Sequence, residues 1–362
     1  CTNWLHSFIN KGVKFIMAYT TVNKSTDHFN VKLYTGNGSS GHSITGVGFQ
    51  PDLVWIKNRQ QSYSHFLTDA VRGVTKEIYS NANGAEYTRS NGLTAFGADG
   101  FTVGDNNGHN QNGNNLVAWN WKAGNSSGSS NSDGSVTSTV SANTTAGFSI
   151  CKFDFPSSGN FTFGHGLGVA PKMFMLKGYT ATANWQVFHG GLGNTYNTQL
   201  NVDSASNTAA NWWGSTSPTS TVCTVGSDLI ETGQTAIAYC FAEKPGFSSF
   251  GSYTANNSSD GPFLFTGMKP AYVVTKCTSA SSHWNCFDNK RSLFNDRDDY
   301  HKLNEATSED TGSSDIQVDF LSNGFKIRGN NNEINGSSRS YIYFAFAEAP
   351  LVGSNNVPCT AR

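Results

Sequence analysis

Hydrophobic residues in this chain occur in short runs separated by glycine, asparagine, serine and aspartate, and helical periodicity is hard to find. Short runs bounded by such turn-forming residues are typical of the strands of a β-sandwich or barrel. Three of the runs, at residues 53–56, 173–176 and 272–274, are apolar at successive positions and therefore on both faces of a strand. This pattern predicts central strands that are covered on both sides.

Each of these runs belongs to a sequence template that occurs three times. The template is a glycine, a proline three residues later, an apolar run and then a lysine, as in GFQPDLVWIK, GVAPKMFMLK and GMKPAYVVTK. Each copy is followed by a closing apolar segment: LVAWNWKAG, AIAYCFAEKP or YIYFAFAEAP. Because Pro51, Pro171 and Pro270 are separated by far more than the roughly 20 to 50 residues of a solenoid unit, each repeat has the size of a domain.

The closing segments alternate large and mostly small side chains. Trp119 and Trp121 lie on one face of the first segment, while Ala118 and Asn120 lie on the other. A strand with this pattern fills one layer with bulky side chains and lets another layer pack closely on its opposite face.

These patterns together predict an all-β protein of three tandem antiparallel β-sandwich domains of the jelly-roll or lectin-like kind. We expect an N-terminal extension at 1–30, repeats at 31–122, 134–245 and 246–350, and a C-terminal tail at 351–362. The Gly/Ser-rich segment 123–133 predicts a flexible linker or exposed loop. Segment 244–251, KPGFSSFG, predicts a packed junction between the second and third repeats.

Composition excludes several classes of partner. The chain has 24 basic and 25 acidic residues and no basic cluster, so it lacks the positive field that drives nucleic-acid binding. No apolar stretch approaches the roughly 20 residues of a membrane span. Aromatic residues make up 13% of the chain, which favours a packed globular protein over disorder.

Seven cysteines without a CxxC pair disfavour zinc and redox sites, and we expect free buried thiols. The acidic and amide-rich loops at 105–115 and 295–299 offer oxygen ligands without the spacing of a calcium loop, so we interpret them as solvated loops. No metal or cofactor is expected.

Catalytic patterns are weak. Glycosidases need a carboxylate pair, and a triad could be drawn from His65, Asp69 and a serine, but the aligned positions of the other repeats carry unrelated residues. The glycine-rich GHGLG from Gly164 opens no helix and is interpreted as a turn. The carboxylates considered are Asp69, Asp288, Glu243 and Glu348.

Carbohydrate recognition has one candidate site. Most tryptophans fall in repeat register, but Trp212 and Trp213, in SNTAANWWGSTSPTS, have no counterpart in the aligned repeats. An exposed aromatic face beside amides suits sugar binding, so we select these two residues with Asn211 and Asn207 as a glycan-binding site. The alternative is an insertion that packs onto its own domain.

Longer motifs carry a family resemblance. They include MAYTTVNKSTDHFNVKLYTGNGSS from Met17, ITGVGFQPDLVWIKNR, GHGLGVAPKM, DFLSNGFKIRG and the ending LVGSNNVPCTAR. In combination they are similar to virion structural proteins, often labelled tail-fibre or putative fibre proteins, of marine tailed phages that infect cyanobacteria and related bacteria. The resemblance covers 17–362; residues 1–16 depart from it, and Met17 resembles the usual start. It implies a virion setting and a lectin-like sandwich, but no catalytic motif or site.

We therefore expect a non-enzymatic virion structural or fibre protein, located in the virion or outside the cell, that binds host-surface glycans. With only 14% charged residues the chain has few charges to protect sheet edges, which favours a homo-oligomer, a trimer by analogy with phage fibres, alongside other virion proteins. Two alternatives remain: a glycan depolymerase on a phage fibre and a bacterial extracellular surface or filament protein.

Overall fold

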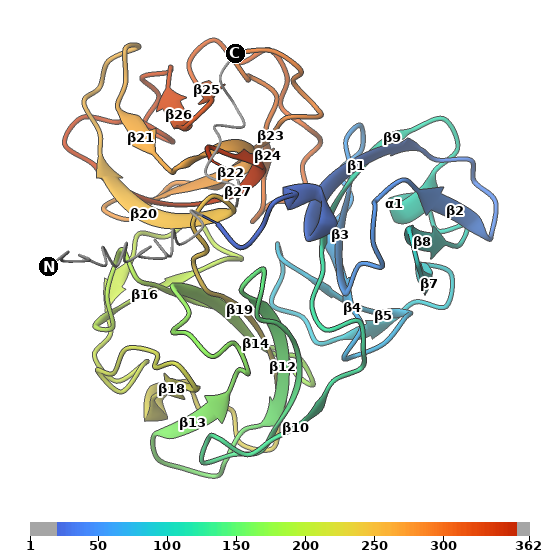
Figure 1. The fold of residues 1–362 in the computed structure, drawn as a ribbon, viewed down its shortest axis with the longest axis vertical. Helices are drawn as coiled ribbons and strands as arrows, with labels where there is room; N and C mark the ends of the chain where they lie inside the picture. Colours follow the sequence, from blue (N-terminus) through green and yellow to red (C-terminus); the bar gives the residue numbers. More distant parts are fainter. Residues whose placement is uncertain (1–19, 353–362) are drawn as a thin grey trace, which may run out of the picture.

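The computed structural model describes residues 20–352, and nearly all regular structure in this part of the chain is β-strand. Three lobes surround a common centre, and each lobe has a large antiparallel sheet facing the centre and a smaller sheet outside it (Figure 1). The predicted all-β sandwich class is confirmed. Most of the predicted N-terminal extension and the last ten residues of the predicted tail lie outside the described residues.

The first lobe is built on a six-stranded sheet and a three-stranded sheet. The large sheet has the order β1 (Phe29–Thr35), β9 (Asn115–Trp121), β3 (Leu53–Asn58), β4 (Phe66–Asp69), β5 (Lys76–Tyr79), β6 (Tyr87–Thr88). The small sheet has the order β2 (His42–Thr45), β8 (Gly100–Val103), β7 (Leu93–Gly97). A short helix, α1 (Asn107–Asn110), connects β8 to β9.

The second lobe repeats this order and extends the large sheet by two strands. Its large sheet runs β10 (Ser129–Asn131), β11 (Ser138–Asn143), β12 (Phe148–Asp154), β19 (Thr235–Phe241), β14 (Met173–Gly178), β15 (Gln186–His189), β16 (Tyr196–Gln199), β17 (Asn207–Thr208). Its small sheet has two strands, β13 (Phe161–Gly164) and β18 (Val222–Val225), and the 3-10 turn η2 (Ser227–Leu229) follows them.

The third lobe has the same plan with fewer strands. Its large sheet runs β20 (Ser248–Thr254), β27 (Ser340–Pro350), β22 (Met268–Cys277), β23 (Trp284–Asp288), β24 (His301–Lys302). Its small sheet runs β21 (Phe263–Phe265), β26 (Gly324–Ile327), β25 (Val318–Leu321). The 3-10 turn η1 (Ser25–Asp27) precedes β1 and packs beside β27.

The strands that carry the sequence template, β3, β14 and β22, occupy the same place in the three large sheets. Each lies between the closing strand of its lobe and the next hairpin strand, so all three are interior strands as predicted. In the third lobe β22 already begins at Met268, and the pairing with β27 is irregular around Pro270. A proline has no N–H to give to the ladder, which explains the irregularity there.

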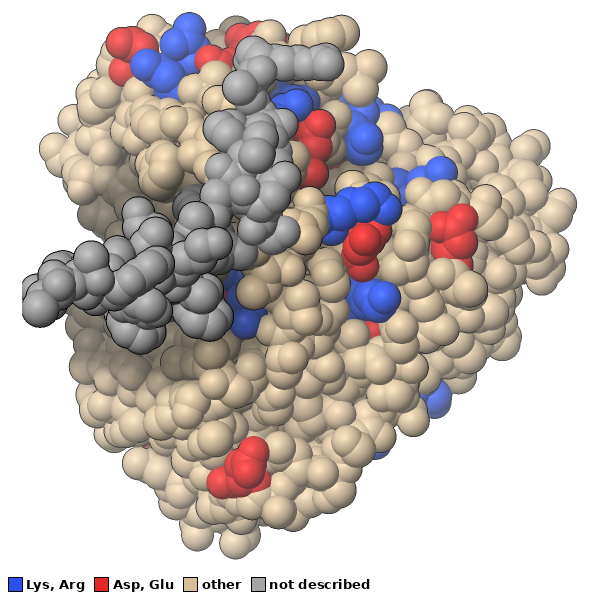
Figure 2. All heavy atoms as spheres, viewed as in Figure 1, with Lys and Arg blue, Asp and Glu red and all other residues tan. Residues whose placement is uncertain are grey.

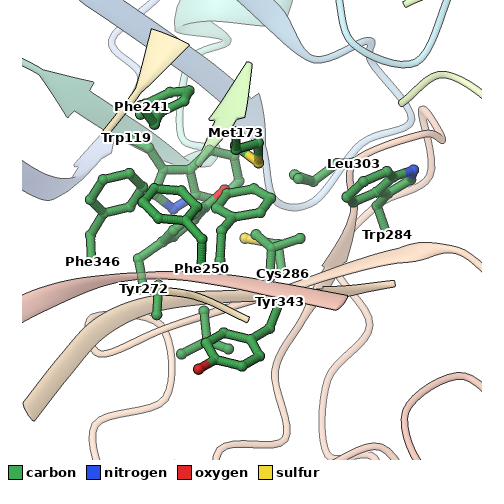
Figure 3. Packing of buried hydrophobic residues seen from close by; sticks show 14 of the residues in the cluster. Trp119, Met173, Phe241, Phe250, Tyr272, Trp284, Cys286, Leu303, Tyr343 and Phe346 are labelled. Atoms are coloured by element: carbon green, nitrogen blue, oxygen red, sulfur yellow. The ribbon is translucent and has the colours of Figure 1, made fainter. Parts of the chain in front are cut away.

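The large side chains of the closing strands meet at the centre of the molecule (Figure 3). Trp121, Phe241 and Phe346 occupy equivalent positions in the three lobes, and their ring centroids lie 5.6 to 6.4 Å apart. The small residues of the same strands, such as Ala118 and Ala238, instead face the small sheet of their own lobe. The predicted division of each closing strand into a bulky and a small face is therefore confirmed, and the bulky face forms the contact between lobes.

Hydrogen bonds from equivalent positions also join neighbouring lobes. The indole of Trp185 donates to the carbonyl of Tyr79 in the first lobe at 2.8 Å. In the same way, the indole of Trp284 donates to the carbonyl of Gln199 in the second lobe at 2.9 Å. Each junction therefore satisfies a buried N–H and places a large aromatic ring between two sheets.

The third lobe contacts the first and closes the ring. The amide of Glu309 donates to the carbonyl of Arg59 at 2.8 Å, and the side chains of these residues form an ion pair at 2.7 Å. Glu309 also pairs with the buried Arg291 of its own lobe at 3.0 Å. The three lobes thus form a closed arrangement with approximate threefold symmetry within a single chain.

The lysines that end the three templates, Lys57, Lys177 and Lys276, are buried in these junctions. Lys177 Nζ donates to the carbonyl of Asn83 in the first lobe at 2.8 Å, and Lys276 Nζ to that of Ser204 in the second at 3.0 Å. Burial lowers the pKa of Lys57 to about 7. It lowers the pKa of Lys177 and of Lys276 to about 8.

The connecting segments differ in part from the predictions. Phe247 and Phe250 are buried against Phe346, so 244–251 is a packed junction as expected. Segment 123–133 is not simply a flexible loop, because β10 belongs to the large sheet and the Ala123 amide donates to Asp52 at 2.7 Å. The first lobe begins earlier than residue 31, since β1 starts at Phe29.

Candidate ligand-binding site

The tryptophan pair selected from the sequence is not an exposed platform. Trp213 is fully buried, its ring contacts Phe174 and Phe188, and its indole donates to the carbonyl of Tyr196 at 2.9 Å. Its role as a sugar-stacking residue is therefore wrong: Trp213 belongs to the core of the second lobe. Trp212 is half-buried and packs against the same cluster.

Asn207 and Asn211 are exposed, as the sequence suggested. Neither tryptophan of the pair is exposed, however, because Trp212 is half-buried and Trp213 is buried, so these amides have no exposed indole of the pair to complete a sugar-stacking site.

The pair also has structural counterparts that the sequence alignment missed. The carbonyl of Trp212 accepts from Gly226 at 2.7 Å, and in the first lobe the carbonyl of Gly92 accepts from Gly104 at 2.7 Å. Trp212 therefore corresponds to Gly92, and Trp213 to the next residue, Leu93, which is also buried. The two pairs begin at the same distance, 41 residues, after Pro171 and Pro51 (212 minus 171 and 92 minus 51), but Gly92 and Leu93 share no residue type with the two tryptophans, and the loop that follows is two residues longer in the second lobe.

In the first lobe the same region contains a concave pocket of about 400 Å³. It lies between β4, the segment after β6 and the loop that leads from β8 into α1. Its polar lining is mixed: a phenol, a guanidinium, amides and a carboxylate surround an apolar floor formed by Phe66. The polar residues that line it include Tyr63, Arg89, Asn91, Asp105 and Asn107.

A buried polar network lies beneath this pocket. Glu77 is buried, forms an ion pair with Arg89, and places its carboxylate 3.2 Å from Nε2 of His109. The hydroxyl of Tyr79 donates to the same carboxylate at 2.9 Å. Burial alone would raise the pKa of Glu77, but the hydrogen bond and charge of His109, together with those of Arg89, lower it below its usual value.

This network fixes the guanidinium that lines the pocket. Arg89 donates to Glu77 and, at 3.2 Å, to the hydroxyl of Tyr79, while its guanidinium carbon lies 4.7 Å from the centre of the Tyr87 ring. The Arg89 side chain is only 24% exposed. Because its orientation is set by buried partners, Arg89 can present donors to a ligand with little loss of conformational entropy.

The loop at the pocket rim is also held in place. The Asn106 side chain accepts from the Gly108 amide at 2.9 Å and contacts the His109 ring nitrogen Nδ1 at 3.0 Å. A side chain at Gly108 would meet the Phe66 ring at 2.5 Å, so a glycine is needed for the loop to approach β4. On the outer side Asn91 donates to Asp105 at 2.7 Å.

The corresponding region of the second lobe is filled. Arg89 corresponds to Ala209, because Gly92 donates to the carbonyl of Arg89 and Trp212 to that of Ala209, both at 3.1 Å. The strand register likewise matches Glu77 with Asn197. The second lobe thus has neither the ion network nor the open space, and an indole occupies the position of a glycine.

The carboxylates considered as catalytic groups are engaged in structural contacts. Asp69 is buried against Arg72 at 2.6 Å and accepts from the Tyr239 hydroxyl of the second lobe at 2.8 Å. Asp288 is buried against Arg291 at 2.5 Å and accepts from the Trp119 indole of the first lobe at 3.0 Å. These two ion pairs help to join neighbouring lobes.

The remaining two lie at strand ends and also have partners. Glu243 accepts from the Phe250 amide at 3.0 Å, and Glu348 pairs with Lys269 at 3.2 Å. None of the four carboxylates lines the pocket of the first lobe.

His65 is a core residue with tryptophan counterparts in the other two lobes. Its amide is bonded to Asn81, as the amides of Trp185 and Trp284 are bonded to Asn201 and Asn304. The equivalent residues are therefore Trp185 and Trp284. Burial, followed by the charge of Lys57, holds the pKa of His65 well below its usual value.

Cysteines and metal-ligand types give no further site in the described residues. Five cysteines between 151 and 286 are free and buried, as expected. No group of three or more His, Cys, Asp or Glu side chains within 20–352 is arranged to hold a metal ion. The amide-rich loop at 105–115 instead forms α1 and the rim of the pocket.

The visible surface carries few charges, and most basic groups on it lie near acidic ones (Figure 2). No helix among residues 20–352 is long and apolar enough to cross a membrane. In comparisons with known proteins, a family described as a domain of unknown function, DUF7483, matches residues 24–350. No curated protein and no solved structure matches the chain.

Proposed function

We propose that this chain, which belongs to the DUF7483 family, is a non-enzymatic virion structural or fibre protein that binds host-surface glycans through the pocket of the first lobe. The observation that carries the glycan proposal is the pocket itself, in which Tyr63, Asp105 and Asn107 surround the fixed guanidinium of Arg89. The virion setting is supported by the motif resemblance between residues 17 and 362.

The chemistry of the lining favours a ligand rich in hydroxyl groups. A hydroxyl both donates and accepts, and the pocket offers carboxylate acceptors, guanidinium donors and amides that do both. The Arg89 charge is balanced by Glu77, so the pocket has no strong excess charge that would demand an anionic ligand. Its volume of about 400 Å³ falls within the range of small-molecule pockets.

The electrostatics favour binding over glycan cleavage. The general acid of a glycosidase needs a raised pKa so that it is protonated at working pH. The pKa of Glu77 is lowered, and its oxygens are engaged by Arg89, His109 and Tyr79. A depolymerase would need a second, differently tuned carboxylate, and Asp105 at the exposed rim is bonded to Asn91.

We also propose that the protein works outside the cell, within a virion, and associates with copies of itself and with other virion proteins. The closed ring of three lobes already supplies an approximate threefold arrangement within one chain. A trimer, expected by analogy with phage fibres, and a dimer are therefore alternative assemblies of this chain, and the mass of the full chain in solution distinguishes them.

A pair of matched double variants tests the glycan site. Asp105→Ala/Asn107→Ala removes two exposed rim groups of the pocket, and Asn207→Ala/Asn211→Ala removes the two exposed amides of the second lobe that were selected from the sequence. On a glycan array and in adsorption to host cells, we expect the first variant to bind at least about tenfold more weakly and the second to bind like the wild type. Both should melt like the wild type, because exposed substitutions usually change stability by less than about 0.5 kcal/mol.

Loss of binding in the Asn207/Asn211 variant alone would contradict the proposed site. It would show instead that the glycan binds to the second lobe, near these two asparagines. Release of new reducing ends from a bound polysaccharide, abolished by Asp105→Ala/Asn107→Ala, would favour the depolymerase instead. Wild-type protein that binds neither an array glycan nor host cells would contradict the glycan proposal as a whole.

A further inference from the structure

The small sheets of the three lobes differ in the residues they present to solvent. In the third lobe, β21 buries Leu264 and exposes Phe263 by 44% and Phe265 by 60%. A single exposed phenylalanine is ordinary, but here two of them flank one buried residue on a single short strand and so form a contiguous apolar patch.

The equivalent strands of the other lobes are polar or small at these positions. Ile44 pairs with buried Phe101 as Leu264 pairs with buried Phe325, which matches Ser43 and Thr45 of β2 with the two phenylalanines. In the second lobe the equivalent strand β13 places Thr162 and Gly164 on either side of buried Phe163. The fold therefore does not require aromatic residues there.

Strand β21 also has an open edge. Among the described strands it is hydrogen-bonded only to β26, and it lies on a side of the third lobe away from the other two lobes (Figure 1). The carbonyl of Pro262 accepts from Ile327, and the amide of Thr266 donates to Asn323. Because ladder bonds alternate along an antiparallel strand, the amides and carbonyls of Phe263 and Phe265 point away from β26.

We infer that β21 is a self-pairing edge through which two copies of this chain join as a twofold dimer. Antiparallel pairing centred on Leu264 brings Phe263 of one copy opposite Phe265 of the other. The outward amide and carbonyl groups of these residues then form two complementary pairs of backbone hydrogen bonds, and the facing aromatic rings contact across the new strand pair.

The charges around β21 favour a second copy of the chain over a partner whose surface carries a strong net positive or net negative charge. Lys326 pairs with Asp260 at 2.6 Å, and Arg328 pairs with Asp319 at 3.3 Å. These charges are paired within the third lobe, so an identical surface brings no unpaired charge from them to the interface. The strand itself carries none of the charged or proline residues with which proteins usually protect an exposed edge.

The dimer rests on the proposed self-association and is independent of the glycan pocket. Its main test is Phe263→Ser/Phe265→Thr, which gives β21 the residues found at the equivalent positions of β2. In sedimentation analysis of the full chain at micromolar concentrations, we expect a wild-type dimer and a variant whose dissociation constant is at least about tenfold higher. Phe294→Ser, which changes another exposed phenylalanine of the third lobe, is the control and should leave the dimer intact.

Cysteine cross-linking tests the register. A mixture of Phe263→Cys and Phe265→Cys chains should form an intermolecular disulfide on oxidation, because these positions face each other, whereas Phe263→Cys alone should cross-link poorly. Equal cross-linking of Phe263→Cys with itself would overturn the register. A wild-type oligomer that persists in Phe263→Ser/Phe265→Thr, or is abolished by Phe294→Ser, would overturn the β21 interface but not self-association. A monomeric wild type would overturn both.

Discussion

The same place in the first and second lobes holds a pocket in one and a packed indole in the other. In the first lobe Gly92 leaves room for the side chains of Glu77, Arg89 and His109, each of which lies 3.3 Å from where a Cβ of residue 92 would be. In the second lobe Trp212 stands at that position and packs on the core. A common fold therefore carries an open polar site or a closed apolar one, depending on a few residues that face away from the centre.

The centre of the molecule follows the opposite rule. Its contacts recur in every lobe because they join the lobes, as the ring contacts among Trp121, Phe241 and Phe346 illustrate. Residues that repeat thus maintain the ring, and residues that differ between lobes give each lobe its own surface. We therefore expect functional sites at positions where the residues differ between the three lobes.

The largest expected loss of stability concerns the packed tryptophan pair of the second lobe. Trp213→Ala should destabilise the protein by about 3 to 5 kcal/mol, because it leaves a large cavity and orphans the carbonyl of Tyr196. Chemical denaturation of the purified variant measures this loss. Glycan binding by the folded variant should be unchanged, and a variant as stable as the wild type would show that the indole is not part of the core.

Disrupting the polar network beneath the first-lobe pocket should lower the free energy of unfolding by somewhat less. Glu77→Ala leaves Arg89 and His109 without their shared carboxylate, and we expect a loss of about 3 kcal/mol, at the low end for a buried pair because Arg89 is partly exposed. Asn197→Ala changes the equivalent residue of the second lobe, where there is no ion pair, and serves as the matched control in denaturant titration. Equal losses in both variants would argue against a special network in the first lobe.

The same network predicts a pH dependence. The pKa of Glu77 is lowered in the folded protein, so the unfolded state binds a proton first as the pH falls. Its contribution to stability is therefore present above the usual glutamate pKa and is lost as the pH falls through the folded value. Compared with the wild type, Glu77→Gln should show a flatter loss of stability in acid when unfolding is followed at a series of pH values below neutral. A steeper loss of stability in Glu77→Gln would contradict a lowered pKa of Glu77 in the folded protein.

The smallest expected change in stability is also the most specific test of the comparison. Gly92→Ala adds one methyl group that presses on the three side chains of the network, and its backbone is not in the left-handed region that favours glycine. We expect a stability change of about 1 kcal/mol or less and glycan binding on the order of tenfold weaker, as the pocket begins to resemble the second lobe. Calorimetric titration with an array-selected glycan compares the affinities of the variant and the wild type. An unchanged affinity would show that Gly92 does not control glycan binding in the pocket.

Much of the fold was accessible from sequence because its signals repeat. The Gly-Pro-Lys template and the large-small alternation around Trp119 identified the interior strands and the two faces of the closing strands. The pocket was not accessible, because Glu77, Arg89 and His109 belong to separate segments and are not repeated in the second lobe, where Asn197 and Ala209 stand in place of Glu77 and Arg89. Trp213 was misplaced for a different reason: its counterpart Leu93 is not aromatic and the residue before it is a glycine, so a core residue looked like a unique surface feature.

The most direct test is a crystal structure of the protein with the host-surface oligosaccharide that it binds most tightly on a glycan array. We predict a sugar in the pocket of the first lobe, hydrogen-bonded to Arg89 and Asp105. A sugar stacked on Trp212 in the second lobe, or bound elsewhere with the first-lobe pocket unchanged, would contradict this assignment.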